Sequence, residues 1–329
     1  MNWRPLLGAA AILGLSVVAL QPASSQARPV AKNGEIAFSY PKHDGASQVF
    51  TVEPNGSRLR QITHGPLSAG QYGLSWSPDG SGLLYTAGHP NGPDAVVRSN
   101  ADGSGATAIS PPCTGTCLGD DNPDYSPDGK QIAFERAFGP VVDDNASGGV
   151  AIFTMGANGS DLRQLTPKGT SENHQPRWSP DGKSIAFVHF DKTTNKGAIE
   201  VMNADGSNVR RLTPFGIDAS DPRWSPDGKH LLFNDYADPV SKRSSNLFTM
   251  RADGTHRVAL THYAGGTLQA RADDWSPDGR QIVFRRLAFS GTDTEVGGFY
   301  IFDTRTKHIR RLTPARIRYD ALAAWGRAG

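Results

Sequence analysis

One short motif recurs along the chain at nearly regular intervals, and it restricts the possible fold more than any other feature. The motif is an aromatic residue followed by Ser-Pro-Asp-Gly, and successive copies lie 46 to 53 residues apart. Its copies begin at Trp76, Tyr125, Trp178, Trp224 and Trp275, and a degenerate copy lies at Trp325. A period of about 50 residues is typical of arrays in which each repeat forms one small structural unit.

Each copy of the motif is followed by the same series of short apolar segments and turns. In one unit these are the triplet Ile185-Ala186-Phe187, residues 199–202, an Asp-Gly turn at 203–207 and a segment ending in Leu212-Thr213. Asp-Gly between apolar segments is a hairpin signal, because the turn requires positive φ. No helical periodicity extends over ten residues of the repeat. We therefore predict four strands per unit, a to d, with strand a ending at the aromatic residue.

The order of these units predicts how the sheet array closes. The chain begins with a lone b-type triplet at Ile36-Ala37-Phe38 and ends with a lone a-type segment at 322–325. Pairing of 322–325 with 35–39 would complete one unit and hide the sheet edges. The sequence thus predicts an all-β fold: a six-bladed β-propeller of four-stranded blades over residues 34–329, closed by its C-terminal a strand and N-terminal b strand. A closed ring favours a monomer.

The N-terminal segment has the pattern of an export signal. Arg4 precedes an apolar run at 6–20, and Ser25-Gln26-Ala27 offers small residues for cleavage. The run is shorter than the roughly 20 residues that span a bilayer, which favours a signal peptide over the alternative of an uncleaved anchor. We expect a signal peptide at 1–27, a lead-in at 28–33, no later transmembrane segment, and a periplasmic or secreted protein.

The chain has only two cysteines, Cys113 and Cys117, and they lie four positions apart. In an oxidising compartment this spacing indicates a local disulfide. A redox-active Cys-x-x-Cys pair has two intervening residues and precedes a helix, and neither condition holds here. The predicted disulfide stiffens one loop.

Charge composition excludes one class of partner. The chain has 34 Lys and Arg against 32 Asp and Glu, a formal net charge of +2, and no basic run. A nucleic-acid-binding surface needs a concentration of positive charge, so no nucleic-acid partner is expected.

The predicted topology places the candidate binding residues on one face of the ring. The a–b and c–d turns are short and uniform, whereas the b–c and d–a connections vary in length and share the other face, and variable loops on a rigid scaffold collect binding residues. The d–a connections lead into the innermost strands, so their side chains would surround the channel mouth. The candidates are Tyr72, Asp120, Asp121, His174, Asp221, Arg271, Asp273, Asp274 and Asp320.

Three interpretations of these residues stay open at this point. The carboxylates could be solvated turn caps, a mouth that attracts cations or basic segments, or a calcium site. No metal-ligand spacing supports the last, so no metal and no cofactor are predicted. The chain also lacks His-Glu-x-x-His and Gly-x-Ser-x-Gly motifs.

The repeats resemble those of the TolB-type propeller family. The resemblance rests on the recurring Trp-Ser-Pro-Asp-Gly-Lys-x-Ile-Ala-Phe and Asn-Ala-Asp-Gly-Ser-x-x-Arg-x-Leu-Thr patterns and covers about residues 34 to 326. True TolB, a periplasmic component of the Tol–Pal system, carries an α/β domain before its propeller, whereas here the first predicted strand follows soon after the cleavage site. Similar repeats occur in oligogalacturonate lyases and prolyl oligopeptidase-like enzymes, so the resemblance implies the fold and does not select a chemistry.

Two functions from different classes follow. The first is a binding or scaffold protein of the cell envelope or exterior that engages a protein, peptide or glycan at the irregular face, and the missing catalytic motifs favour it. The alternative is a metal-assisted polysaccharide lyase or another small carbohydrate-active enzyme. Lyases with similar repeats use several His and a Gln around a divalent metal, and His174-Gln175, His43, His89 and His189 are predicted to lie on that face.

Overall fold

The computed structural model describes most of the chain after the predicted signal peptide. The described residues are 31–41, 47–64, 68–89, 92–139, 148–169, 171–236, 244–264, 268–289, 295–314 and 322–328. The predicted signal peptide and residues 28–30 of the lead-in lie outside them. Within the described residues, no helix is long and apolar enough to span a membrane.

The Ser-Pro-Asp-Gly motif forms a tight turn whose polar groups bond to one another. In the third copy, Ser179 Oγ donates to Asp181 Oδ1 (2.6 Å), the amide of Lys183 donates to the same oxygen (3.1 Å), and Gly182 has φ 71°. The serine–aspartate bond recurs in the other four copies at 2.6 to 2.7 Å. These five carboxylates therefore act locally, as turn-forming groups.

The ends of the chain meet in one four-stranded sheet, as the repeat order predicted. In spatial order it contains β24 (Ala323–Arg327), β1 (Asn33–Pro41), β2 (Ser47–Val52) and β3 (Arg60–Gln61). Strand β24 pairs antiparallel with β1, with Ile36 opposite Trp325 and Phe38 opposite Ala323. This pairing closes the array.

The next eight strands form one sheet in which two four-stranded units are joined. One unit contains β4 (Ser68–Trp76), β5 (Gly82–His89), β6 (Gly92–Asn100) and β7 (Thr107–Ala108); the other contains β8 (Cys117–Tyr125), β9 (Gln131–Phe138), β10 (Val150–Gly156) and β11 (Arg163–Gln164). A single parallel pair, Asp94 with Gly119, connects β6 to β8. A Cβ at Gly119 would approach the Asp94 amide nitrogen to 3.0 Å, so the missing side chain permits this contact.

Three further sheets have four strands each, all antiparallel and in sequence order. They contain β12 (Ser171–Trp178), β13 (Ser184–Asp191), β14 (Lys196–Asn203) and β15 (Arg210–Arg211); β16 (Ala219–Trp224), β17 (His230–Asp235), β18 (Asn246–Arg251) and β19 (Val258–Ala259); and β20 (Leu268–Trp275), β21 (Gln281–Phe289), β22 (Glu295–Asp303) and β23 (Ile309–Arg311). A 3-10 turn, η1 (Phe215–Ile217), precedes β16.

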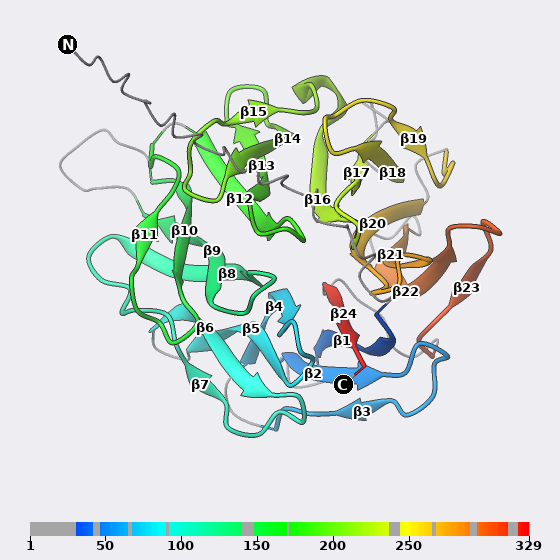
Figure 1. The fold of residues 1–329 in the computed structure, drawn as a ribbon, viewed down its shortest axis with the longest axis horizontal. Coiled ribbons are helices and arrows are strands. Elements are labelled where there is room, and N and C mark those ends of the chain that lie inside the picture. The colour runs from blue at the N-terminus through cyan, green and yellow to red at the C-terminus, as the bar shows by residue number, and fades with distance from the viewer. Residues whose placement is uncertain are drawn as a thin grey trace, which may run out of the picture. The chain divides into compact units, whose positions relative to one another are not determined.

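Within residues 31–329 the sheets follow one another around a central axis, and the predicted all-β propeller is confirmed (Figure 1). Strands β4, β8, β12, β16, β20 and β24 lie innermost (Figure 1). The core lies between neighbouring sheets: Phe38 and Ile36 pack with Val283 and Phe299 of the preceding sheet. Burying each such side chain contributes about 1.5–3 kcal/mol.

The recurring tryptophans link neighbouring sheets, as their repetition suggested. Trp76 Nε1 donates to the carbonyl of Ala324 (3.2 Å) and Trp224 Nε1 to that of Arg177 (3.2 Å). Each indole thus reaches the backbone of the innermost strand before it. Trp275 makes the same bond to the carbonyl of Arg223 (3.4 Å), whereas the indole nitrogens of Trp178 and Trp325 are buried without a partner among the described residues. The tryptophans that make this bond are therefore structural.

Candidate functional site

A cavity of about 500 Å³ opens among the starts of the innermost strands and the ends of the strands that follow them. It therefore lies on the face formed by the b–c and d–a connections. It is lined by Asn122, Gln175, Val188, Phe190, Asn195, Gly197, Asp218, Ala219, Ser220, Asp221, Tyr236, Gln269, Arg271, Arg285 and Leu322. The lining combines aliphatic and aromatic carbon with amide, hydroxyl, carboxylate and guanidinium groups, which is the mixture found in ligand sites.

Three residues of this lining have an unusual backbone conformation. Asn122, Gln175 and Asp221 have φ of 52°, 54° and 55°, although each immediately precedes a proline. Proline disfavours such conformations in the residue before it, and holding non-glycine residues there costs about 1–3 kcal/mol each. At each point the register with the next strand shifts, which marks a bulge. Bulges of this kind redirect side chains and often lie beside functional sites.

The bulges occupy the same position of the repeat, three residues before the aromatic residue. Gly73 holds that position in β4 and has φ 70°. A Cβ on Gly73 would lie 2.5 Å from the Cα of Asn122, so only glycine fits beside the next bulge. Neighbouring innermost strands are thus packed bulge against bulge at the mouth.

Side chains at two of the bulges bind each other across a sheet boundary. Gln175 Nε2 donates to Asp221 Oδ1 (2.7 Å), and the amide of Asp221 donates to Gln175 Oε1 (2.9 Å). Nearby, Asp218 Oδ1 accepts a bond from the amide of Gly197 (2.8 Å). These bonds fix one wall of the cavity.

The opposite wall rests on a buried ion pair. Arg285 lines the cavity, and its Nε donates to Asp273 Oδ1 (2.9 Å), which also accepts the amide of Ala323 (3.3 Å). Burial raises the pKa of Asp273 to about 7, although Arg285 opposes the shift. Asp273 itself is fully buried, so it does not line the cavity but holds Arg285 in place.

Tyr236 and Arg271 add a hydroxyl and a guanidinium to the cavity. Burial raises the pKa of Tyr236, and the charge of Arg271 partly opposes that shift. The hydroxyl is therefore protonated and can donate or accept a hydrogen bond. With Asp218 and Asp221, the site carries charges of both signs.

A cluster of ionisable groups stands beside the cavity. His174 Nδ1 lies 3.6 Å from Glu135 Oε1, and its Nε2 lies 3.4 Å from Glu172 Oε2. Burial opposes protonation of the ring, but Glu135 and Glu172 outweigh burial and raise the pKa of His174. Asp121 faces Glu135 across β8 and β9, and burial with the Glu135 charge raises the pKa of Asp121 to about 7. Glu135 also accepts the amide of Gln175 (2.7 Å), so this cluster adjoins the cavity wall.

Two other predicted candidates are buried away from the cavity. Asp120 forms a bidentate pair with Arg136, with Nε to Oδ1 at 2.6 Å and Nη2 to Oδ2 at 2.8 Å. Asp274 accepts the amides of Trp275 (2.8 Å) and Trp325 (2.9 Å). Both carboxylates stabilise the innermost strands.

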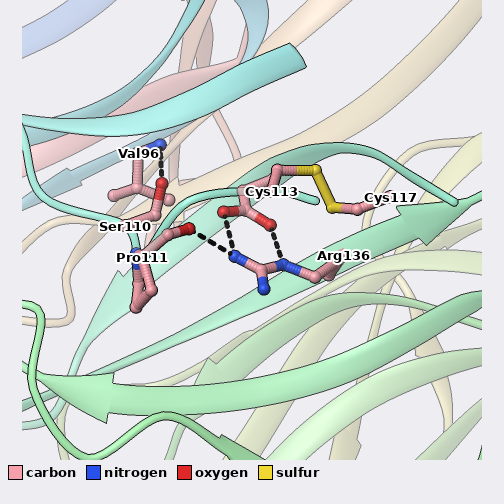
Figure 2. The surroundings of a disulfide bond; sticks show 7 residues. Val96, Ser110, Pro111, Cys113, Cys117 and Arg136 are labelled. Atoms are coloured by element: carbon pink, nitrogen blue, oxygen red, sulfur yellow. Dashed lines mark hydrogen bonds and ion pairs between the residues drawn. A yellow bond between two sulfur atoms is a disulfide. The ribbon is translucent and has the colours of Figure 1, made fainter. Parts of the chain in front are cut away.

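The Cys113–Cys117 loop lies beside Arg136 of β9, and the structure contains the expected disulfide (Figure 2). Arg136 Nη2 also donates to the carbonyl of Pro111 (3.0 Å), and Ser110 Oγ accepts the amide of Val96 (3.1 Å) (Figure 2). Hydrogen bonds therefore hold the N-terminal end of the loop, before the covalent bridge.

The nine predicted mouth residues are thus divided among several places. Only Asp221 and Arg271 line the cavity, while His174 and Asp121 stand beside it. Asp320 lies outside the described residues, as does the side chain of Tyr72. His43 and the side chain of His89 lie outside them too, and His189 Nδ1 lies 3.8 Å from Glu200 Oε2.

Several lining residues were missed as candidates from the sequence: Asn122, Ser220, Tyr236 and Gln269. The signal for one of them was present, because a polar residue before proline recurs three positions before the aromatic residue. Within the described chain, no group of three or more His, Cys, Asp or Glu side chains is arranged to hold a metal ion.

Comparison with known proteins agrees with this architecture. Residues 113–272 match the family model of the TolB beta propeller domain (PD40), which confirms the resemblance predicted from the repeats. The uncharacterized protein Atu1656 of Agrobacterium fabrum is 27% identical over 149 residues, or 45% of this chain and 48% of that protein. The alignment thus spans about half the length of this curated relative.

Solved structures share the fold at low sequence identity. TolB from Acinetobacter baumannii is 17% identical, with a TM-score of 0.65 over 89% of this chain and 66% of that one. A protein assigned to TolB from Agrobacterium tumefaciens is 20% identical, with a TM-score of 0.62 over 91% and 99% of the two chains. An oligogalacturonate lyase in complex with manganese is 16% identical, with a TM-score of 0.57 over 84% and 72%. At these identities the likeness establishes the fold alone.

Proposed function

We propose that this chain, whose residues 113–272 match the TolB beta propeller domain, is an exported binding protein that engages a protein, peptide or glycan of the cell envelope or exterior. In this proposal residues 1–27 are removed and 34–329 act as one monomeric domain in the periplasm or outside the cell. The eight-stranded sheet counts as two blades, giving a six-bladed propeller. The ligand occupies the cavity among β12, β16 and β20.

The observation that carries the proposal is the coincidence of the strained bulges with the cavity. Asn122, Gln175 and Asp221 have positive φ, and all three line the same cavity. Strain of about 1–3 kcal/mol per residue persists where the surrounding structure enforces it, and such residues cluster at ligand sites. Here the neighbouring strands of the ring, which carry bulges at the same position, hold the strained residues in place.

The chemistry of the lining supports a polar, extended ligand. Phe190 and Val188 offer apolar contact, while Tyr236, Ser220 and Arg271 offer hydrogen bonds of both kinds. Peptides and glycans present this same combination of apolar surface and hydrogen-bonding groups.

Direct binding measurements test the proposal. Residues 28–329 would be screened against peptide and glycan arrays and against envelope and culture-supernatant fractions, beside the cavity variants Arg271→Ala and Tyr236→Phe. Lys130→Ala is the control, because Lys130 is exposed on an a–b turn. We expect a ligand whose binding falls at least about tenfold, or 1.4 kcal/mol, in a cavity variant and stays unchanged in the control. Equal binding by all four proteins would place the site elsewhere.

His174 favours an enzyme as the second candidate. It lies between Glu135 and Glu172, and those carboxylates raise its pKa, so it can hold a proton near neutral pH. The described residues do not form a metal-binding group, so no metal-assisted step is derived for it. Depolymerisation of a polysaccharide that is lost in His174→Gln would favour this candidate over the binding protein.

A further inference from the structure

A second cavity, of about 190 Å³, lies at the other end of the innermost strands. Its walls include the residue before the aromatic residue in each of these strands: Ser75, Asp124, Arg177, Arg223, Asp274 and Ala324. Prolines of three Ser-Pro-Asp-Gly turns also line it, so it reaches the face opposite the first cavity. Nothing in the proposed function uses this cavity.

Two buried guanidinium groups share this space. Arg177 and Arg223 are 4% and 6% exposed. Arg177 Nη1 donates to the carbonyls of Asn122 (3.1 Å) and Pro176 (2.7 Å). Arg223 Nε donates to the carbonyl of Asp273, and its Nη1 to that of Pro222 (3.1 Å). All of these acceptors are neutral backbone groups, so neither cation is neutralised by a direct bond.

The guanidinium group of Arg177 has a buried hydrogen-bond donor without an acceptor among the described residues. Nη2 of Arg177 is buried and has no hydrogen-bond partner within the described chain. A buried donor without an acceptor costs about 1–3 kcal/mol, and more when the group is charged. Such a group in a native protein commonly marks the place of an ion or an ordered water.

The two carboxylates of the cavity are already occupied by other donors. Asp124 accepts the amide of Trp178 (2.8 Å) and the hydroxyl of Ser75 (3.2 Å). Asp274 accepts the amides of Trp275 and Trp325. Burial raises the pKa of Asp124, and it raises that of Asp274 to about 6, although the charges of Arg177 and Arg223 oppose the shift of Asp124 and that of Arg223 opposes the shift of Asp274.

We propose that the axial cavity binds a small oxyanion between Arg177 and Arg223. The guanidinium group matches the paired oxygens of carboxylate, phosphate and sulfate. A water molecule occupies about 30 Å³ of liquid volume, so the cavity accommodates a tetrahedral oxyanion together with a few waters. The anion would accept a hydrogen bond from the buried Nη2 of Arg177 and reduce the repulsion between Arg177 and Arg223, which adds to the effect of burial in lowering the pKa of Arg177.

The same chemistry has two possible sources, a free anion or the terminal carboxylate of a peptide. Both are used as probes: inorganic phosphate, and a pair of identical short peptides with a free or an amidated C-terminus. Isothermal titration calorimetry of residues 28–329 measures binding at constant ionic strength, with chloride as the background salt. Saturable binding of phosphate or of the free-carboxylate peptide supports the proposal. Binding of neither would overturn it.

Variants locate the site. Arg177→Met and Arg223→Met remove one guanidinium each, and Arg163→Met is the matched control because Arg163 is exposed and bonds the carbonyl of Asp205 on the outer edge. We expect the affinity for the bound probe to fall at least tenfold in the two axial-cavity variants and to stay unchanged in the control. Equal affinity in all three variants would overturn the assignment of the site to the axial cavity.

Thermal unfolding provides a second readout that separates binding from general stabilisation by salt. At about 100-fold excess over Kd, bound phosphate should raise the wild-type Tm by about 5 °C. Sulfate and phosphate also stabilise proteins by exclusion from the surface, but that effect does not saturate at low concentration. An equal, non-saturating rise in wild type and Arg177→Met contradicts the proposal. Should an axial-cavity variant fail to fold, saturation in the wild type alone decides the outcome.

Discussion

Gln175 and Asp221 exchange two hydrogen bonds across the boundary between two neighbouring sheets, at 2.7 and 2.9 Å, and both residues have positive φ. They occupy equivalent repeat positions 46 residues apart. The bonds hold each residue in a conformation that the following proline disfavours. One wall of the larger cavity therefore contains strained residues, and hydrogen bonds between equivalent positions of two repeats stabilise their conformation.

Replacing Gln175 separates the strain from the hydrogen bonds. Gln175→Ala removes both side-chain bonds and keeps the strain, so we expect a loss of about 2 kcal/mol in the free energy of unfolding. Gln175→Gly removes the same bonds but tolerates φ 54°, and it should be about 1 kcal/mol more stable than the alanine variant. Urea unfolding measures both. An alanine variant as stable as the glycine variant would show that the bulge is unstrained.

The Asp120–Arg136 pair leads to a different expectation, because both partners are buried. Asp120→Asn leaves Arg136 charged and unpaired, and breaking a buried pair in this way costs about 3–5 kcal/mol. The exposed pair of Arg58 and Glu53, at 3.5 Å, is the control, and Glu53→Gln should cost less than about 1 kcal/mol. Similar losses in the two variants would contradict a structural role for Asp120.

The fold could be predicted from the sequence because of its repeat. The aromatic-Ser-Pro-Asp-Gly turns, the b and c strands and the pairing of 322–325 with 35–39 depend on local turn chemistry and on order along the chain. The contact of Asp94 with Gly119 could not be anticipated, because it joins two units through a glycine that has no motif around it. The d strands are short, as predicted, but they end before the Leu-Thr pair, with two residues in β15 and three in β23.

The site was harder to predict for a physical reason. Sequence places Asp120, Asp121, Asp273 and Asp274 in the d–a connections, but the bulges decide where each side chain points. Asp120 and Asp273 face arginines within the protein, whereas Asp221 faces the cavity. A bulge changes the alternation of faces along a strand, so counting residues from the aromatic position does not give the direction of a side chain.

Buried carboxylates predict how stability depends on pH. Burial raises the pKa of Asp273 to about 7, and that of Asp235 and Asp274 to about 6, from 3.8. The folded chain therefore binds more protons than the unfolded chain between these values, and stability falls as pH rises from about 4 to 7. The raised pKa of His174 acts in the same direction, whereas the lowered pKa of Glu135 opposes it.

Calorimetry should accordingly give a higher Tm at about pH 5 than at about pH 8. Asp273→Asn mimics the protonated carboxyl group, so its Tm should change less between the two conditions. The turn residue Asp79 does not contribute in this range, since hydrogen bonds from Ser77 and Ser81 lower its pKa to about 2. A Tm that increases toward pH 8 would contradict the assignment.

The disulfide should matter little to global stability. It closes a loop of only a few residues, for which chain entropy gives about 2 kcal/mol. Arg136 and Ser110 hold the same loop through Pro111 and Val96 without it. The double variant Cys113→Ser, Cys117→Ser should therefore unfold cooperatively and lose at most about 2 kcal/mol. A loss above about 4 kcal/mol in urea unfolding would require a larger role for the bridge.

Closure of the ring predicts a second large loss of stability, comparable to that of Asp120→Asn. Trp325 is buried and lies opposite Ile36 of β1. Its backbone amide donates a hydrogen bond to Asp274 of β20, so Trp325 joins the first and last sheets. Trp325→Ala leaves a cavity in this junction and should cost about 3–5 kcal/mol. Trp76, whose indole bonds Ala324 from a more exposed position, is the comparison, and Trp76→Phe should cost about 1 kcal/mol. Because opening the junction exposes the edges of β1 and β24, the Trp325 variant should also aggregate during unfolding. Light scattering during a thermal ramp measures this, and reversible unfolding with the stability of the wild type would show that the ring does not depend on the pairing of its ends.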